Sequence, residues 1–161
     1  MLKQFVSATA LAATALTSSL AFAVDDARSA IHITATIPTE QFHVLPQTPS
    51  FGQDEKMNYN IVNGELSSLS QVYYVKNTLG SVAAYIDGGP ASLYNGSSAI
   101  PLTTTFNGVT LTGSSQQVVD DATSTPGTQA VMTIAAAKPG TNQTGQYTAD
   151  LTVIFDAVPR S

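Results

Sequence analysis

The sequence predicts an all-β protein, a sandwich of immunoglobulin type, and three observations support this fold class. Short runs rich in Val, Ile, Tyr, Phe and Thr alternate with clusters of Gly, Pro, Asn and Ser. No segment of the exported part keeps a helical period over three turns. The longest runs alternate apolar and polar residues with a period of two, as half-buried strands do. Several short strands at this spacing are typical of a sandwich.

Residues 1–23 have the three parts of a signal peptide. Lys3 provides a positive start, residues 5–20 form an apolar run of small residues, and residues 21–23 read Ala-Phe-Ala, a small-x-small cleavage site. A membrane anchor is the alternative, but the run is short and rich in Ser and Thr. We therefore expect export, with a mature chain that begins at Val24.

The first predicted strand of the mature chain covers residues 31–37. Ile31, Ile33, Ala35 and Ile37 fall on one face, and His32 with two threonines falls on the other. This strand lies close to the new N-terminus, where chains usually fray unless another element holds them. The sequence therefore raises one central question, namely which sheet this strand completes.

The predicted strands that follow are separated by turn signals. Asn107-Gly108 between two alternating runs indicates a two-residue type I′ hairpin, because both positions favour positive φ. Loops are expected at residues 87–98 and 120–129, and a helical turn or a polar loop at residues 63–71. The strands expected between the first and the last are residues 41–45, 56–62, 71–77, 81–87, 100–106, 109–113, 116–119 and 130–137.

The last predicted strand, residues 146–156, alternates as clearly as the first. A one-residue slip would turn its apolar face to water, so its register is strongly specified. In an ordinary, complete sandwich both terminal strands would pair with internal neighbours, and the pattern alone leaves that alternative open. The apolar face consists of Tyr147, Ala149, Leu151, Val153 and Phe155.

Composition argues against nucleic acid, metal and catalysis. Charged residues make up 11% of the chain and the net charge is -5, whereas nucleic-acid binding needs a basic surface. The chain has no cysteine, and His32 and His43 have no carboxylate at ligand spacing. Adjacent carboxylates such as Asp120 and Asp121 point to opposite faces of a strand, and no nucleophile, zinc or phosphate motif occurs. We expect no enzyme activity, no metal and no cofactor.

Three segments resemble alpha-class chaperone-usher pilins, the colonisation-factor-antigen type of fimbrial major subunit. The acidic lead-in and the strand with Ile31, Ile33, Ala35 and Ile37 match the start of that family. The middle run, residues 96–113, is similar as well. The family ends with Ala-Ala-x-Lys and then Gly-x-Tyr before an alternating strand, and the matching residues here are Ala136, Ala137, Lys138, Gly145 and Tyr147. The tail, residues 156–161, runs past the family's usual end.

The resemblance implies an incomplete immunoglobulin-like sandwich with an N-terminal donor-strand extension. Residues 24–38 would be the extension and residues 39–161 the pilin domain. The first strand would complete the sheet of the next subunit, and the face from Tyr147 to Phe155 would line the acceptor groove and the contact with a chaperone. The implied partners are neighbouring subunits of a homopolymer, a periplasmic chaperone, an outer-membrane usher, a tip adhesin and a possible host receptor. The implied location is a cell-surface fimbria reached through the periplasm, where it mediates adhesion.

A different class of function also fits the sequence. A monomeric exported module that binds carbohydrate or a host surface could use the same sandwich, with its first strand folded back. Loops on a rigid sandwich often carry recognition, and the residues around 87–98 would form such a surface. Polymerisation separates the two hypotheses, because only the pilin requires it.

Overall fold

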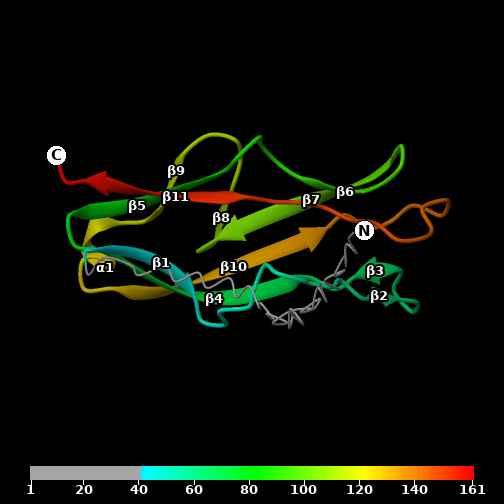
Figure 1. The fold of residues 1–161 in the computed structure, drawn as a ribbon, viewed down its shortest axis with the longest axis horizontal. Coiled ribbons are helices and arrows are strands. Elements are labelled where there is room, and N and C mark those ends of the chain that lie inside the picture. Colours follow the sequence, from blue (N-terminus) through cyan, green and yellow to red (C-terminus); the bar gives the residue numbers. More distant parts are fainter. Residues whose placement is uncertain (1–40) are drawn as a thin grey trace, which may run out of the picture. The chain divides into compact units, whose positions relative to one another are not determined.

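The computed structural model describes residues 41–161, which fall within one of the two compact units of the chain, Thr36–Ser161. This part is almost entirely β-structure, so the predicted fold class is confirmed (Figure 1). None of its helices is long and apolar enough to cross a membrane. Its elements are β1 (Phe42–Pro46), β2 (Tyr59–Asn60), β3 (Glu65–Leu66), β4 (Leu69–Asn77), β5 (Gly80–Ile86), β6 (Ser92–Asn95), β7 (Ser98–Phe106), β8 (Val109–Thr110), β9 (Gln116–Val119), α1 (Asp121–Ser124), β10 (Thr128–Ala136) and β11 (Val153–Pro159).

Two sheets of unequal size form the sandwich. The large sheet has the order β1-β4-β10-β7-β6, with β8 also paired to β7, and the small sheet has the order β11-β5-β9. All of these pairs are antiparallel. A separate two-stranded sheet, β2-β3, precedes β4. Because the large sheet has more strands than the small one, part of its inner face has no strand of the small sheet opposite it.

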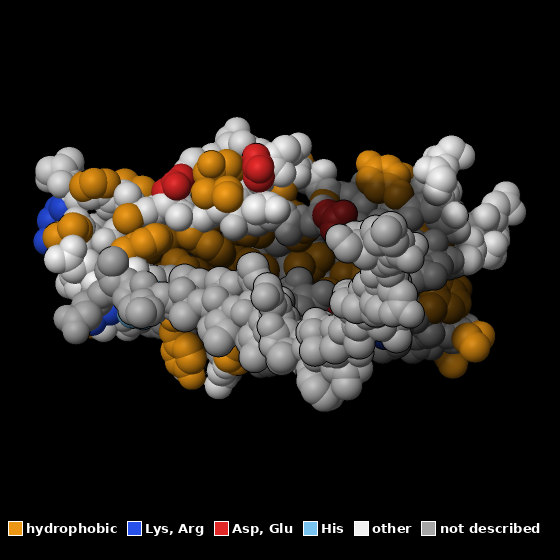
Figure 2. All heavy atoms as spheres, in the orientation of Figure 1, with side chains coloured by type: hydrophobic (Ala, Val, Ile, Leu, Met, Phe, Trp, Pro, Cys, Tyr) orange, Lys and Arg blue, Asp and Glu red, His pale blue; other side chains and the backbone are white. Residues whose placement is uncertain are grey.

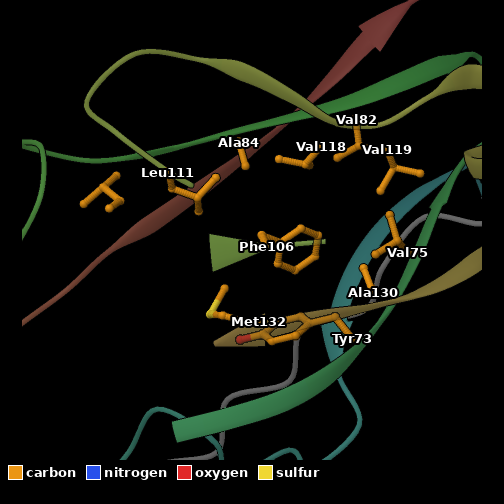
Figure 3. Packing of buried hydrophobic residues seen from close by; sticks show 11 residues of the cluster. Tyr73, Val75, Val82, Ala84, Phe106, Leu111, Val118, Val119, Ala130 and Met132 are labelled. Carbon is orange, nitrogen blue, oxygen red and sulfur yellow. The ribbon is translucent and has the colours of Figure 1, made fainter. Parts of the chain in front are cut away.

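The hydrophobic core fills the space where both sheets are present. Phe106 is fully buried between the layers, with Tyr73 and Met132 from the large sheet on one side (Figure 3). Val82 and Val119 of the small sheet close the core from the other side. The rings of Tyr73 and Phe106 meet edge to face with centroids 5.5 Å apart, a geometry that aromatic quadrupoles favour.

The predicted hairpin between β7 and β8 is confirmed. Asn107 has φ 50° and Gly108 has φ 78°, so both turn residues lie in the left-handed region that a type I′ turn requires. The Asn107 side chain adds a hydrogen bond from its amide to the Val118 carbonyl, 2.7 Å long, which ties the hairpin to β9.

Three expectations about connecting segments are wrong. Residues 87–98, expected as a loop, contain β6, because Gly96-Ser97 forms a tight turn into β7. Residues 63–71 are neither a helical turn nor only a polar loop, since β3 and the start of β4 lie there. Residues 120–129 contain the short helix α1, which Asp120 caps by accepting a 2.7 Å hydrogen bond from the Thr123 amide.

Two predicted strands are much shorter than expected. In residues 56–62 only Tyr59–Asn60 is a strand, and in residues 109–113 only Val109–Thr110 is one. Both are hairpin arms whose pairing lasts for two residues before the chain leaves the sheet. The remaining predicted strands that lie within the described residues correspond to observed strands, apart from the last one.

The last predicted strand is interrupted because the chain changes sheets. Thr148 exchanges two backbone hydrogen bonds with Tyr94 at the edge of the large sheet. Four residues later the Thr152 carbonyl accepts from the Asp87 amide, and from Val153 onward the chain pairs with β5 of the small sheet. An alternating pattern indicates which face of a strand is apolar, but it does not indicate which neighbouring strand it pairs with. The continuous strand expected over residues 146–156 therefore begins only at Val153.

Candidate functional site

A long groove lies between the two sheets beside β11. Its volume is about 1260 Å³, and hydrophobic side chains line the hollow between the layers in Figure 2. The floor is the inner face of β4, β7 and β10, the part of the large sheet that β5 and β9 leave uncovered. One wall is formed by β11 and the segment before it, and the other by residues 51–57, which follow β1.

The edge of β11 makes the groove suited to strand addition. Among residues 41–161, β11 pairs with β5 on one side and is the edge strand of the small sheet on the other. An edge strand presents backbone N–H and C=O groups that a further strand can pair with. The groove therefore combines an apolar floor with a backbone template along one wall, the two requirements for strand addition.

All five residues predicted from the last alternating strand line this groove. Val153 and Phe155 belong to β11, whereas the other three lie in the segment that crosses between the sheets. Tyr147 is held in place by a 2.8 Å hydrogen bond between its hydroxyl and that of Ser98. Four of the five are half-buried, and Ala149 is exposed because the chain has left one sheet and not yet joined the other. The structure thus brings these five residues to the groove together with Gln146, Thr148 and Asp150, which the sequence placed on the opposite face.

The residues of the floor were not predicted from the sequence. Met132 and Ile134 on β10, Leu102 on β7 and Tyr73 on β4 line the groove together with Phe51. The alternation in β10 could have suggested that Met132 and Ile134 share a face. It could not show that Ile134 is left half-buried beside the buried Met132, because that depends on strand order rather than on local pattern.

An aromatic cluster closes one part of the groove floor. The centroid of the Phe155 ring lies 4.9 Å from that of Phe106 and 6.1 Å from that of Tyr73. The rings of Phe51 and Tyr73 meet edge to face with their centroids 6.3 Å apart. Burial, and to a smaller extent the negative charge of Glu55, raises the pKa of the Tyr73 hydroxyl. Tyr73 is therefore neutral at physiological pH and contributes an apolar ring to the groove.

The segment between β10 and β11 is fixed by polar contacts to β6 and β7. The Gln143 side-chain amide donates to the Ala99 carbonyl at 2.9 Å and to the Ser98 hydroxyl at 3.2 Å. The Asn95 amide donates to the Thr144 carbonyl at 3.2 Å. These bonds hold one end of the groove wall in a defined position, although the segment forms no strand there.

The residues predicted to form the donor strand lie outside the described part of the chain. Ile31, Ile33, Ala35 and Ile37, the four residues predicted to form the donor face, belong to residues 1–40, as does His32. Within residues 41–161 no group of three or more His, Asp or Glu side chains is arranged to hold a metal ion. Asp120 and Asp121 have structural roles at the start of α1, as a helix cap and as an ion-pair partner.

Comparisons with known proteins agree with the geometry. A family model described as "CS1 type fimbrial major subunit" matches residues 27–156, most of the chain. A search of curated proteins found no match. Among solved structures, the chain is similar to the CooA pilin subunit from enterotoxigenic Escherichia coli, with a TM-score of 0.52 and 15% sequence identity. That match covers 65% of this chain and 79% of the pilin chain, and at this identity it establishes similarity of fold alone.

Proposed function

The chain belongs to the CS1 type fimbrial major subunit family, and from that premise we propose that it polymerises head-to-tail by donor-strand exchange. Membership makes it a structural subunit of a cell-surface fimbria, which assembles with other subunits and is not an enzyme. The observation that carries the finer proposal is the groove beside the edge of β11. The strand that fills this groove is residues 31–37 of the neighbouring subunit.

The donor strand has the side chains that such a groove requires. Ile31, Ile33 and Ile37 enter the groove as alternate residues, and Ala35 occupies a shallow position between them. Burying one Ile side chain contributes about 1.5 to 3 kcal/mol. Three such side chains and a ladder of backbone hydrogen bonds to β11 give a contact that dissociates very slowly.

On the acceptor side, the half-buried apolar residues gain most from the added strand. Leu151, Val153 and Phe155 line the groove with Tyr147 and Ala149, and Met132 and Ile134 lie on the floor. The donor strand completes the small sheet, so these side chains become part of a closed core. In this proposal, the residues predicted from sequence form one wall and the residues of the large sheet form the base.

The contact is heterologous, because an N-terminal strand of one subunit meets a groove of another. Such contacts do not close on themselves unless the rotation between subunits forms a ring, and otherwise they generate an open helical filament. The product is a fimbria that carries many copies of the same surface, and the possible host receptor would bind such a surface or a tip adhesin.

Before assembly the same edge is an aggregation hazard, because an unpaired apolar edge pairs with any strand in reach. We propose that a periplasmic chaperone lends a strand along β11 and that an outer-membrane usher exchanges it for the incoming donor strand. The residues from Tyr147 to Phe155 would then contact the chaperone first and the next subunit later.

The test is the size of the exported chain when it is expressed with its neighbouring periplasmic genes. Gel filtration and electron microscopy should show heat-resistant multimers or fibres for the full chain. Removal of residues 24–37 should leave only chaperone-bound or aggregated subunits. Soluble monomers of similar stability in both cases would contradict donor-strand exchange and would favour the monomeric binding module.

A matched pair of substitutions in the donor strand sharpens this test. Ile33→Asn places an amide on the face that enters the groove, whereas Thr34→Asn places the same side chain on the opposite face. Multimers should be lost or strongly reduced with Ile33→Asn and retained with Thr34→Asn. Equal losses in the two variants would contradict the proposed orientation of the strand.

A further inference from the structure

Two small apolar patches lie at opposite ends of the sandwich. The hairpin tip, Ile61 and Val62, connects β2 to β3, and these side chains are 88% and 96% exposed. The corner, Leu79 and Val158, lies where β4 turns into β5, and its side chains are 57% and 39% exposed. The hairpin precedes β4 and the corner follows it, so the nine residues of β4, about 30 Å of extended chain, separate the two patches (Figure 1).

The hairpin tip is tied by several hydrogen bonds, and it carries two exposed β-branched residues. The Asn60 side-chain oxygen accepts a hydrogen bond from the Val62 backbone amide at 2.9 Å. The Asn60 backbone carbonyl accepts one from the Gly64 amide at 2.8 Å. The Asn63 side chain accepts from the Glu65 amide at 3.1 Å and donates to the Glu65 carboxylate at 3.2 Å. Tips of short hairpins normally carry polar residues, so a fixed apolar tip points to an interaction surface. A preorganised surface of this kind loses little entropy on binding.

The hairpin stands at one end of the groove. Tyr59, Gly64 and Leu66 line the groove, and the Lys138 side chain, which follows β10, lies next to Gly64 and lines the groove too. β11 begins at this end, since Val153 pairs with Ile86 at the end of β5, and it runs toward the corner, where Pro159 pairs with Gly80. Figure 2 shows hydrophobic side chains protruding at the end where Figure 1 places β2 and β3.

The direction of the donor strand decides which end of the groove faces the next subunit. Antiparallel pairs have the better hydrogen-bond geometry and are the more common, and every pair in the described part is antiparallel. A strand added antiparallel to β11 runs from the corner toward the hairpin. Its last apolar residue, Ile37, would then leave the groove beside the hairpin tip.

The donor subunit's own corner must then lie close to that tip. Three residues lie between Ile37 and Gln41, and the four residue steps from one to the other span at most about 14 Å in a fully extended chain. The carbonyl of Gln41 accepts a 2.8 Å hydrogen bond from the Thr78 amide, next to Leu79. The Arg160 amide donates to the Leu79 carbonyl at 2.7 Å, which places the end of β11 at the same corner.

We infer that the hairpin tip of one subunit docks onto the corner of the subunit whose strand fills its groove. This inference rests on the proposed function and adds a second contact between the same two subunits. The occupant is a second copy of this chain, because each apolar patch lies where donor-strand exchange brings its counterpart. The docked tip would fix the angle between successive subunits, which a strand joined by a short linker leaves free.

Cysteine crosslinking tests the contact, because the chain has no cysteine of its own. The double variant Val62→Cys with Leu79→Cys should form a ladder of covalent multimers on non-reducing gels after a short bismaleimide is added to assembled fibres. The matched control is Val131→Cys with Leu79→Cys, because Val131 is also exposed but lies on β10, away from the hairpin. The control should give no ladder.

A second variant tests the contact without any crosslink. Ile61→Ser with Val62→Ser should leave donor-strand multimers intact on gels but lower the temperature at which they dissociate and make fibres more curved in electron micrographs. Fibres without a specific ladder and with unchanged shape would overturn the docking contact and leave the proposed function in place. Loss of binding to lipid vesicles with unchanged fibres would also overturn it and assign the tip to a membrane surface. Absence of multimers in the unsubstituted chain would overturn both proposals.

Discussion

The closed half and the groove half of the sandwich use similar residues and reach different degrees of burial. β10 passes through both halves, so it gives a direct comparison. Ala130 and Met132 lie in or beside the core and are 2% and 4% exposed, whereas Ile134, two residues further along the same face, is only half-buried. The difference shows that burial here depends on whether the opposite sheet continues and not on the hydrophobicity of the strand itself.

The same contrast occurs within β11. Phe155 contacts Phe106 in the core but also lines the groove, and Val153 at the start of the strand is half-buried. Half-buried apolar side chains still expose apolar surface to water, so covering them would contribute the rest of their transfer free energy. The proposed donor strand would cover these side chains, so in that proposal the groove half is the part of the domain that a partner completes.

Phe106→Ala should have the largest effect, because it removes the central side chain of the closed half. Phe106 is fully buried and contacts both Tyr73 and Phe155, so truncation leaves a cavity that neighbouring strands cannot fill. We expect the free energy of unfolding to fall by about 3 to 5 kcal/mol, measured by urea denaturation. The loss should be the same with and without a synthetic peptide of residues 24–38. Val131→Ala on the exposed face of β10 is the control, with an expected change below about 0.5 kcal/mol.

Ile134→Ala should separate the two halves, because its effect depends on the donor strand. In a chain that lacks residues 24–38, Ile134 is half-buried in the groove and its truncation should cost little. When the peptide fills the groove, the same truncation should approach the cost of a buried Ile, about 2 kcal/mol or more. Urea denaturation with and without the peptide measures both values, and the peptide stabilises the unsubstituted chain by mass action. Equal costs in the two conditions would contradict the view that the groove is completed by this strand.

The sequence predicted more of the groove than of its surroundings. The alternation of residues 146–156 placed five residues on one face, and all five line the groove, but Gln146, Thr148 and Asp150 of the opposite face line it as well. The break at Thr148 and the later start of β11 were missed, because the chain exchanges one pairing partner for another without any change in its pattern. Ile134 and Tyr73 joined the site only through strand order, which is a property of the whole fold.

The hairpin tip illustrates a different limit. Ile61 and Val62 end a run that alternation assigned to a strand, and the structure leaves both side chains in water. Apolar character usually predicts burial within the same chain. For a subunit that assembles, an apolar residue can instead be reserved for a neighbour, and a single sequence does not distinguish these two uses.

The smallest expected effect concerns the corner end of β11, which is fixed in a different way from its groove end. Arg160 donates two hydrogen bonds to the Asp121 carboxylate, and these bonds, together with one from the Thr125 hydroxyl, lower the pKa of Asp121 to about 2. Because the folded-state pKa lies below its ordinary value near 3.8, the ion pair stabilises the fold above about pH 4, and this contribution is lost as the pH falls toward 2. Both side chains reach solvent, so the effect should be small and should weaken with salt.

Arg160→Gln should therefore loosen the end of β11 without affecting the groove. Hydrogen exchange of the Arg160 amide, which donates to the Leu79 carbonyl, should be faster in the variant at pH 6. As the pH falls from 4 toward 2, the difference between the two chains should shrink, because a growing fraction of Asp121 is protonated in the unsubstituted chain and its ion pair is lost. Exchange near Val153 should not change, since that part of the strand is held by β5 and by the core. A uniform increase in exchange along β11 would contradict this expectation and would show that the corner end and the groove end of the strand open as one unit. A change at the docking contact would then also affect the groove.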